Sequence, residues 1–218
     1  MLRRELISEV ANTIIDLQLH HPIRVAISGI TASGKTTFAN ELAEELRRRK
    51  REVVRTSIDN FHNPRSIRYR QGKDSAIGYY EDAHDYQAFK EKLLIPLGEN
   101  GDRQYQTVSL DLEKDAYVNP EQLLATDDTI FIVDGTFLFK KELIHLFDYK
   151  IFVQTDFELA RKRGAKRETI AFGSYESAEA MFINRYHAAS SLYLKEHNPQ
   201  DNADIVINNN DVGSPYFL

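Results

Sequence analysis

A stretch near the start of the chain combines glycines, a lysine and a threonine at a spacing that can bind phosphate. Residues 29–36 read GITASGKT and match the pattern G-x-x-x-x-G-K-[ST] at every fixed position. The glycines let backbone N–H groups face a phosphate, and the N-terminus of a following helix adds partial positive charge. The residues that we expect to bind the nucleotide are Gly29, Thr31, Ala32, Ser33, Gly34, Lys35, Thr36 and Thr37.

Two aspartates follow apolar segments and therefore stand at the ends of predicted strands. Asp134 directly follows residues 129–133, TIFIV, where a carboxylate beside a phosphate-binding loop can hold Mg²⁺ together with the Thr36 hydroxyl. Asp59 closes residues 53–59 and would lie at the same edge of the sheet, where it can accept a proton from an incoming hydroxyl. Either aspartate could instead begin a turn, but the neighbouring loop favours the chemical roles.

Cations are concentrated in residues 161–167, which form part of a predicted helix. Arg163 and Arg167 are four residues apart and share a face of that helix. The segment could close over phosphate as a lid, or it could be an ordinary solvated face, and both interpretations remain open. The phosphate-binding loop predicts that Lys35 reaches the β- and γ-phosphates. The lid interpretation predicts that Arg163 and Arg167 also reach phosphate, while Arg161 and Lys162 point elsewhere.

Strands and helices alternate along the chain and would bring these residues to one end of a sheet. Apolar patterns predict helices over 2–20, 36–50, 82–97, 140–147, 157–169 and 178–196, and strands over 24–30, 53–59, 104–111, 129–133, 149–154 and 204–208. Such alternation is typical of an α/β fold, with a parallel sheet that helices cover on both faces. We expect one domain over 1–218, with an N-terminal helix over 1–20, an acceptor-side insertion over about 60–120 and a lid over about 157–175.

The composition excludes several classes of protein. Lys and Arg total 28 and Asp and Glu total 33, so the formal charge of −5 disfavours a sequence-blind nucleic-acid coat. The chain has no cysteine, which excludes disulfides, thiolate metal sites and a cysteine nucleophile. No apolar run approaches the roughly 18 residues of a membrane span. We therefore expect a soluble cytoplasmic protein without a membrane partner, and homo-oligomers remain open.

The set of motifs narrows the chemistry further. The chain lacks the N-K-x-D element of guanine-specific GTPases and an L-S-G-G-Q-like transporter signature, which leaves a small kinase. The ordered segments GITASGKTT, SIDNFH, YYEDAHDY, FIVDGTF and FVQTDFELARKRGAKRE resemble the uridine kinase and phosphoribulokinase family over residues 24–210. The resemblance implies a P-loop nucleoside-kinase-like fold of three layers, with a parallel sheet of about five strands, a lid helix and a small hairpin insertion. It implies the use of ATP with Mg²⁺. It also implies Asp59 as general base, Asp82 as ligand of ribose hydroxyls, and Arg163 and Arg167 as phosphate ligands in the closed lid.

The acceptor side departs from the family pattern. Asp134 replaces a glutamate, His62 replaces a tyrosine, and residues 109–115 lack the aromatic and histidine side chains that read a pyrimidine. The cations at 65, 68, 70 and 73 suit an anionic acceptor, an RNA patch or a solvated loop. The expected acceptor-binding residues are Asp82, His62, Arg68, Tyr80 and Arg185. Packing in the interior is an alternative role for Tyr79, Tyr80 and Tyr86. We expect no metal site at His84 or His187, because neither is spaced from another histidine as metal ligands usually are.

The sequence thus predicts an ATP- and Mg²⁺-dependent kinase that phosphorylates a hydroxyl of a small molecule, similar to a uridine kinase. Alternatives are an anionic sugar phosphate or vitamin precursor as acceptor, a nucleotide-binding regulator without turnover, and an RNA-binding ATPase. Because residues 109–115 carry no base-reading side chains, uridine and cytidine are expected to be weak substrates.

Overall fold

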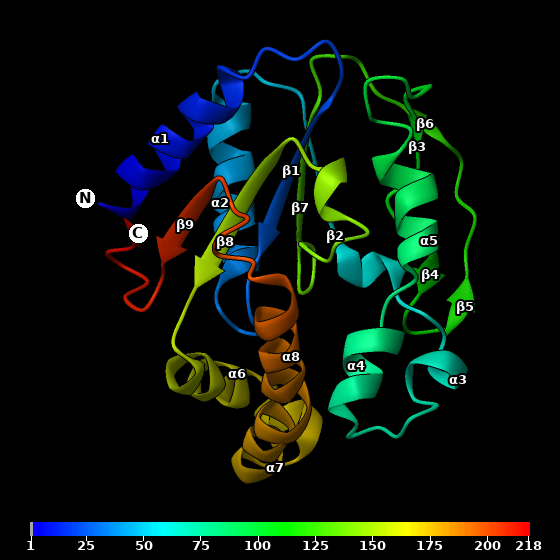
Figure 1. Ribbon diagram of the computed structural model, residues 1–218, viewed down its shortest axis with the longest axis vertical. Helices are drawn as coiled ribbons and strands as arrows, with labels where there is room; N and C mark the ends of the chain where they lie inside the picture. The colour runs from blue at the N-terminus through cyan, green and yellow to red at the C-terminus, as the bar shows by residue number, and fades with distance from the viewer. Residues whose placement is uncertain (1) are drawn as a thin grey trace.

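A six-stranded sheet forms the middle layer of the protein, whose computed structural model describes residues 2–218 (Figure 1). The strand order is β10-β9-β8-β1-β7-β2. β10 (Tyr216–Phe217) runs antiparallel to β9, and the other neighbours are parallel. The five parallel strands are β1 (Ile23–Ser28), β2 (Val53–Ser57), β7 (Ile130–Gly135), β8 (Tyr149–Gln154) and β9 (Ile205–Asn208). The predicted three-layer α/β fold with about five parallel strands is confirmed.

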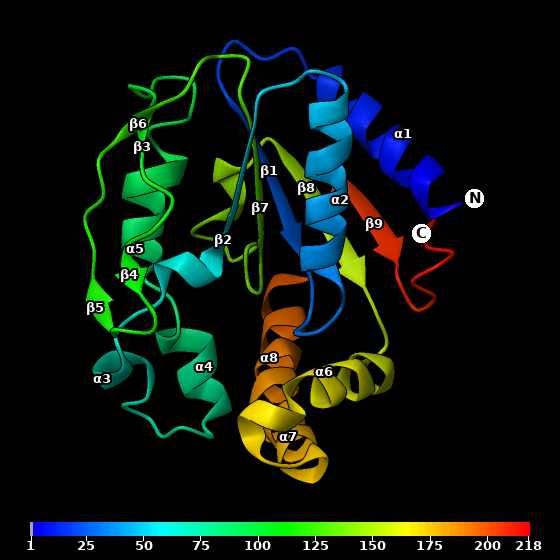
Figure 2. The same ribbon diagram turned by 180° about the vertical axis from the view of Figure 1, so that it is seen from behind.

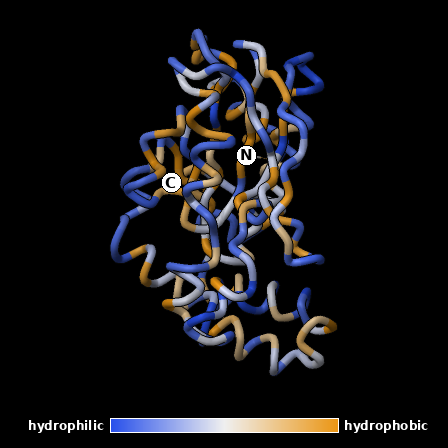
Figure 3. Tube along the Cα trace, turned by 90° about the vertical axis from the view of Figure 1, so that its right-hand side faces the viewer, coloured by the Kyte–Doolittle hydropathy of each residue, from blue (hydrophilic) through white to orange (hydrophobic). Residues whose placement is uncertain are grey.

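The sheet has a separate apolar core on each face. All six residues of β7 are buried, and they alternate between the two faces. Phe131 and Val133 belong to one core, whereas Ile130 and Ile132 belong to the other. In Figure 3 the apolar segments accordingly run through the middle of the molecule, with hydrophilic segments around them.

Helices cover both faces of the sheet. α1 (Arg3–Ile15) and α2 (Lys35–Arg48) pack together on one face, which Figure 2 shows from the front. The opposite face is covered by α5 (Tyr86–Phe89), the π-helical turn Lys90–Leu94 and α8 (Ala188–His197). α1 is shorter than the predicted helix over 2–20. No helix in residues 2–218 has both the length and the apolar composition needed to span a membrane.

The insertion on the acceptor side is more structured than the sequence predicts. The sequence patterns predict no helix or strand within residues 60–80, but this segment contains α3 (Arg65–Arg68) and most of α4 (Ala76–Asp82), whose first turn is capped by the Ser75 hydroxyl. The single strand expected over 104–111 is wrong. Instead β3 (Gln104–Tyr105) pairs with β6 (Leu123–Leu124), and β4 (Leu110–Asp111) pairs with β5 (Ala116–Tyr117).

The segment predicted as a lid, over about 157–175, forms α6 (Phe157–Phe172). It is followed by α7 (Tyr175–Met181) and by a π-helical turn over Phe182–His187 that leads into α8. α6 and α7 lie near the carboxyl ends of the strands, with α3 and α4 across from them in the lower half of Figure 1. The short helix expected over 140–147 is reduced to a 3₁₀ turn, Ile144–Leu146, and another 3₁₀ turn, Ile58–Phe61, follows β2. The predicted site residues thus come from elements that meet at one end of the sheet.

Candidate active site

The phosphate-binding loop joins β1 to α2, as the sequence predicts. Ala32 (φ 66°) and Gly34 (φ 93°) have left-handed backbone conformations, which turn the chain sharply into the helix. At Gly29 a Cβ would lie 2.6 Å from the carbonyl oxygen of Val153, so this close approach requires glycine. The turn leaves the first N–H groups of α2 facing outward, where an anion can accept from them.

Side chains from distant segments fasten this loop. The Ser33 carbonyl accepts hydrogen bonds from Asn209 Nδ2 at 2.7 Å and Thr155 Oγ1 at 3.0 Å. His187 Nε2 lies 3.1 Å from the Thr31 carbonyl oxygen. The hydroxyls of Thr31 and Ser33 are buried and have no hydrogen-bond partner in the part of the chain that the structure describes. The loop is therefore rigid in its backbone and retains unused hydrogen-bonding capacity.

A cavity of about 350 Å³ lies over the loop and fits the phosphate end of a nucleotide. Its lining residues are Thr31, Ala32, Gly34, Lys35, Thr36, Thr37, Asp59, Tyr79, Asp134, Thr136, Arg163, Arg167 and Val212. Six of the eight residues predicted to bind the nucleotide line this cavity. Gly29 and Ser33 do not line it, and they shape the loop from behind.

Lys35 is only 8 % exposed, and its ammonium donates to the Ile30 carbonyl at 3.2 Å. Burial lowers the pKa of Lys35 below its ordinary value, while the charges of Asp134 and Asp59 act in the opposite direction. A buried cation with one carbonyl partner is well placed to bind the oxygens of an entering triphosphate.

The expected metal ligands are in contact. Thr36 Oγ1 donates to Asp134 Oδ2 at 2.5 Å, and Asp134 is 2 % exposed. Hydroxyl and carboxylate oxygens are hard donors that suit Mg²⁺, so this pair fits the ion. The sequence analysis missed Arg55 of β2, whose Nη2 lies 2.5 Å from Asp134 Oδ1. The position of Arg55 in the sequence does not indicate this contact, because Arg55 reaches Asp134 from the neighbouring strand of the sheet.

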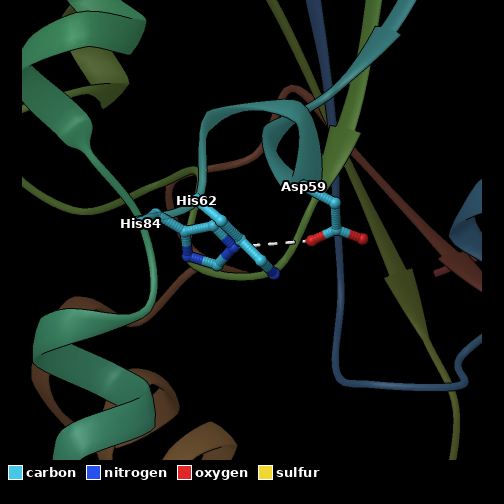
Figure 4. Close-up of side chains that lie close together, drawn as sticks. All are labelled: Asp59, His62 and His84. Carbon is cyan, nitrogen blue, oxygen red and sulfur yellow. Dashed lines mark hydrogen bonds and ion pairs between the residues drawn. The ribbon is translucent and has the colours of Figure 1, made fainter. Parts of the chain in front are cut away.

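Asp59 stands in the 3₁₀ turn after β2, and its side chain is 66 % exposed toward the cavity. His84 comes from the segment between α4 and α5, and its Nε2 lies 3.4 Å from Asp59 Oδ1 (Figure 4). The His62 ring lies beside that of His84, with centroids 4.6 Å apart, and the two residues form a β-bridge. Because His84 is 2 % exposed, it holds the carboxylate from a fixed position.

The electrostatics of this cluster favour an ionised Asp59. Burial is the largest single influence and raises the pKa of Asp59, but the hydrogen bond from His84 and the neighbouring positive charges together outweigh it, so the pKa lies below its ordinary value. Burial, together with His84, lowers the pKa of His62 to about 3, which leaves the imidazole neutral. Asp59 is therefore ready to accept a proton at neutral pH.

The same three residues also resemble a metal-binding group. Their ligand atoms all lie within 4.8 Å of one another, although the sequence spacing of His84 gave no sign of such a group. The positive charges of Arg68, Arg185 and Lys35 act on this cluster and oppose the entry of a further cation. We therefore interpret the histidines as groups that orient the base.

A second cavity, of about 480 Å³, adjoins the first and shares with it Thr31, Asp59, Tyr79 and Arg167. The predicted residues His62, Arg68 and Arg185 also line this acceptor cavity. Tyr79, which the sequence analysis interpreted as packing, thus stands between the two cavities, and burial raises its pKa to about 12, so that its hydroxyl stays protonated.

The structure does not bring Asp82 and Tyr80 to either cavity. Asp82 is 4 % exposed and is occupied by Arg70, whose Nε donates to it at 3.0 Å, and by Gln71 Nε2 at 2.7 Å. The Tyr80 hydroxyl donates to Glu196 at 2.7 Å, and its ring packs against Phe137. Both assignments to the acceptor pocket are therefore corrected, since the two side chains are committed to the fold.

The cations of residues 161–167 lie in two different environments. Arg163 and Arg167 both line the nucleotide cavity, and Arg163 is held by hydrogen bonds to the carbonyls of Asn209 and Asn210. Arg161 instead pairs with Glu179 at 3.0 Å, and Lys162 pairs with Glu158 at 2.6 Å. Arg163 and Arg167 therefore face the cavity, although Arg167 also pairs with Glu168 at 2.8 Å, whereas Arg161 and Lys162 lie outside the cavity lining.

The hairpin β4–β5 contributes little to the acceptor cavity. Leu112 is its one residue in the lining. Asp115, in the turn, accepts from the backbone N–H of Arg65 at 2.9 Å and pairs with Arg68 at 3.2 Å. The hairpin therefore positions an arginine, and within the described chain it supplies no aromatic ring to the cavity wall.

Comparisons with known proteins agree with this geometry. A family model described as "Phosphoribulokinase / Uridine kinase family" matches residues 24–212. The chain is similar to a uridine kinase from Lactobacillus johnsonii, with 28 % identity over 176 residues, which cover 79 % of this chain and 78 % of that protein. It is also similar to uridine-cytidine kinase B from Dictyostelium discoideum, with 27 % identity over 150 residues, or 68 % of this chain and 59 % of that protein.

A solved structure of a possible uridine kinase from Bacillus stearothermophilus superimposes with a TM-score of 0.71. It shares 26 % identity, and the match covers 93 % of this chain and 97 % of that one.

Proposed function

Because the chain belongs to the phosphoribulokinase/uridine kinase family and is an ATP-dependent kinase, we propose that it transfers the γ-phosphoryl group of ATP to a hydroxyl of a small molecule held in the acceptor cavity. One observation carries this proposal: the two cavities meet at Asp59, with Thr31, Tyr79 and Arg167 around the junction. A phosphate in one cavity and a hydroxyl in the other would therefore approach each other beside a carboxylate.

The donor side binds and orients the triphosphate. The N-terminus of α2 and the Lys35 ammonium would bind the β- and γ-phosphates. Thr36 and Asp134 would hold Mg²⁺, which when bound neutralises charge on the phosphate oxygens. Arg55 pairs with Oδ1 of Asp134, whereas the Thr36 hydroxyl contacts Oδ2, so the carboxylate is held at both oxygens.

Asp59 would act as the general base. The acceptor oxygen attacks the γ-phosphorus, its bond to phosphorus forms as the bond to the ADP oxygen breaks, and its proton passes to Asp59 Oδ. His84 keeps the carboxylate in place by donating from Nε2. Arg163 and Arg167 would offset the charge on the transferring group, and closure of α6 would exclude water and limit hydrolysis.

Two observations bear on the acceptor. Two similar proteins are a uridine kinase and a uridine-cytidine kinase, which supports a nucleoside as the acceptor. The hairpin, which contributes only Leu112 to the described cavity lining, supports an acceptor without a pyrimidine base, and so do the arginines of the wall. We favour an acceptor without a pyrimidine base and expect uridine and cytidine to be weak substrates. Intact Lys35, Thr36, Asp59 and Asp134 favour turnover over a purely regulatory role.

The test is ADP release from ATP and Mg²⁺ across nucleosides, sugar phosphates and vitamin precursors, with an RNA-stimulated ATPase arm. We expect acceptor-dependent release with at least one non-nucleoside hydroxyl compound. A uridine kcat/KM above about 10⁴ M⁻¹s⁻¹ would instead identify a nucleoside kinase. ADP release that depends only on RNA, or none with any acceptor in a single-turnover experiment, would contradict the proposal.

A further inference from the structure

We infer that the acceptor carries an anionic group, a carboxylate or a phosphate ester, and that Arg185 and Arg68 bind this group. Both arginines line the acceptor cavity and neither lines the nucleotide cavity. The inference rests on the proposed function, because it names the class of molecule that the same site phosphorylates.

Arg185 is a buried cation without a counter-ion. It is 5 % exposed, and no carboxylate of residues 2–218 forms a salt bridge with it within 4.0 Å. One nitrogen, Nη1, donates to the Lys73 carbonyl. The guanidinium carbon lies 5.3 Å from the ring centre of Tyr69 and 5.1 Å from that of Tyr79. Aromatic faces compensate only part of the lost hydration of a cation, so the remaining donors suit an anion that enters the cavity.

Arg68 is the second buried cation of this wall. Its side chain is 7 % exposed, and its Nη2 pairs with Asp115 at 3.2 Å. Its Nε is buried without a hydrogen-bond partner in the described chain. The guanidinium carbon lies 5.2 Å from the ring centre of Tyr69, the same ring that Arg185 contacts. An unused, buried donor in a cavity wall is costly unless a ligand accepts from it.

The charges of the whole wall point the same way. Arg68, Lys73, Arg167 and Arg185 line the cavity, whereas its carboxylates are Asp59 and Glu168. Glu168 is paired with Arg167 at 2.8 Å. Asp59 lies at the junction with the nucleotide cavity. Positive charge therefore remains unpaired in the part of the cavity that the nucleotide does not share. A neutral nucleoside would leave Arg185 without a counter-ion and the Nε of Arg68 without an acceptor, whereas an anion could pair with both side chains.

Pairs of acceptors that differ only in the anionic group test this inference. The probes are D-glycerate with glycerol, pantothenate with pantothenyl alcohol, and ribose 5-phosphate with ribose. ADP release is measured with the wild-type protein, Arg185→Gln and Arg68→Gln. Arg65→Gln is the matched control, because Arg65 is an exposed cation of α3, the helix that also carries Arg68, and lies outside the cavity. A paired charge lost in a desolvated site costs on the order of 10²-fold in specificity.

We expect the anionic member of at least one pair to be preferred by about 10²-fold in kcat/KM, and this preference to fall to about tenfold or less in Arg185→Gln or Arg68→Gln. Arg65→Gln should keep the wild-type preference, and melting temperatures report whether each variant folds. Calorimetric binding of the same anionic probes to protein saturated with a non-hydrolysable ATP analogue gives a second readout that needs no turnover.

Equal use of neutral and anionic members, or a preference that survives in both folded cavity variants, would overturn the inference and leave phosphoryl transfer standing. Anion binding that depends on Arg185, without ADP release from any acceptor, would support the anion site and contradict the proposed function. The absence of both anion binding and ADP release would contradict the anion site and the proposed function together.

Discussion

The nucleotide cavity and the acceptor cavity are assembled in different ways. Six of the thirteen residues that line the nucleotide cavity come from the continuous segment 31–37. The acceptor cavity draws its lining from short segments between Thr31 and Tyr186, among them α3, α4 and the π-helical turn before α8. The first cavity depends on one loop-to-helix turn, whereas the second depends on the way the insertion and the lid pack together. Substitutions in the two halves should therefore have different signatures.

The largest effect is expected on the donor side. Lys35→Ala should lower kcat by at least about 10³-fold, since it removes the cation that binds the β- and γ-phosphates. The melting temperature should change little, because the ammonium has a single carbonyl partner. Steady-state ADP release and thermal unfolding check both points. Wild-type turnover in this variant would contradict the nucleotide assignment.

The lid arginines test whether the two halves close on each other. Arg167 lines both cavities, so Arg167→Ala should reduce kcat by about 10³-fold while weakening ATP binding far less. Arg163→Ala should act in the same direction. Arg161→Ala is the matched control, because Arg161 is paired with Glu179 and should change kcat by about twofold or less. Equal behaviour of the three variants would identify an ordinary charged helix face.

His84→Gln should affect the position and the pKa of Asp59. The amide cannot fully replace Nε2, and a reacting group displaced by about 1 Å can lose up to 10² in rate, so kcat should fall by about tenfold to 10²-fold. Because the hydrogen bond from His84 lowers the pKa of Asp59, its loss raises that pKa.

The acidic limb of the kcat/KM profile should therefore move to higher pH in His84→Gln. His145→Gln, at an exposed histidine, is the control for the profile. A slower variant with an unchanged acidic limb would show that His84 has only a packing role.

Asp82→Asn should leave the chemistry almost unchanged. Asp82 is ion-paired with Arg70 outside both cavities, so KM for the acceptor should change by about twofold or less. Thermal unfolding should show a loss of about 1–3 kcal/mol, because the buried carboxylate loses its charged hydrogen bonds. Asp74→Asn, at an exposed loop position, is the matched control. A large rise in acceptor KM would restore Asp82 to the site.

The two halves also differ in how far sequence reasoning reaches. The donor residues follow one another in a pattern whose geometry is fixed by the turn into α2, and Thr36 meets Asp134 because adjacent parallel strands end at the same edge of the sheet. The five parallel strands were likewise predictable from their apolar runs.

The acceptor side could not be predicted in the same way. Tyr79 and Tyr80 are neighbours on α4, and successive side chains of a helix point about 100° apart, so only one faces the cavity. Which one does so depends on how α4 packs against Phe137 and the lid. His84 is brought close to Asp59 by a β-bridge between His84 and His62, which joins two irregular segments. A contact of this kind leaves no periodic pattern in the sequence.

The most direct test of the account is the chemical step itself in Asp59→Asn. Single-turnover transfer from γ-labelled ATP to a substrate found in the acceptor screen should be slower by about 10²–10⁴-fold, because the amide keeps the shape of the side chain but cannot take the proton. The affinity for a non-hydrolysable ATP analogue should stay within about twofold, since Lys35 and the N-terminus of α2 remain intact. Transfer at the wild-type rate would contradict the claim that the two cavities meet at a general base.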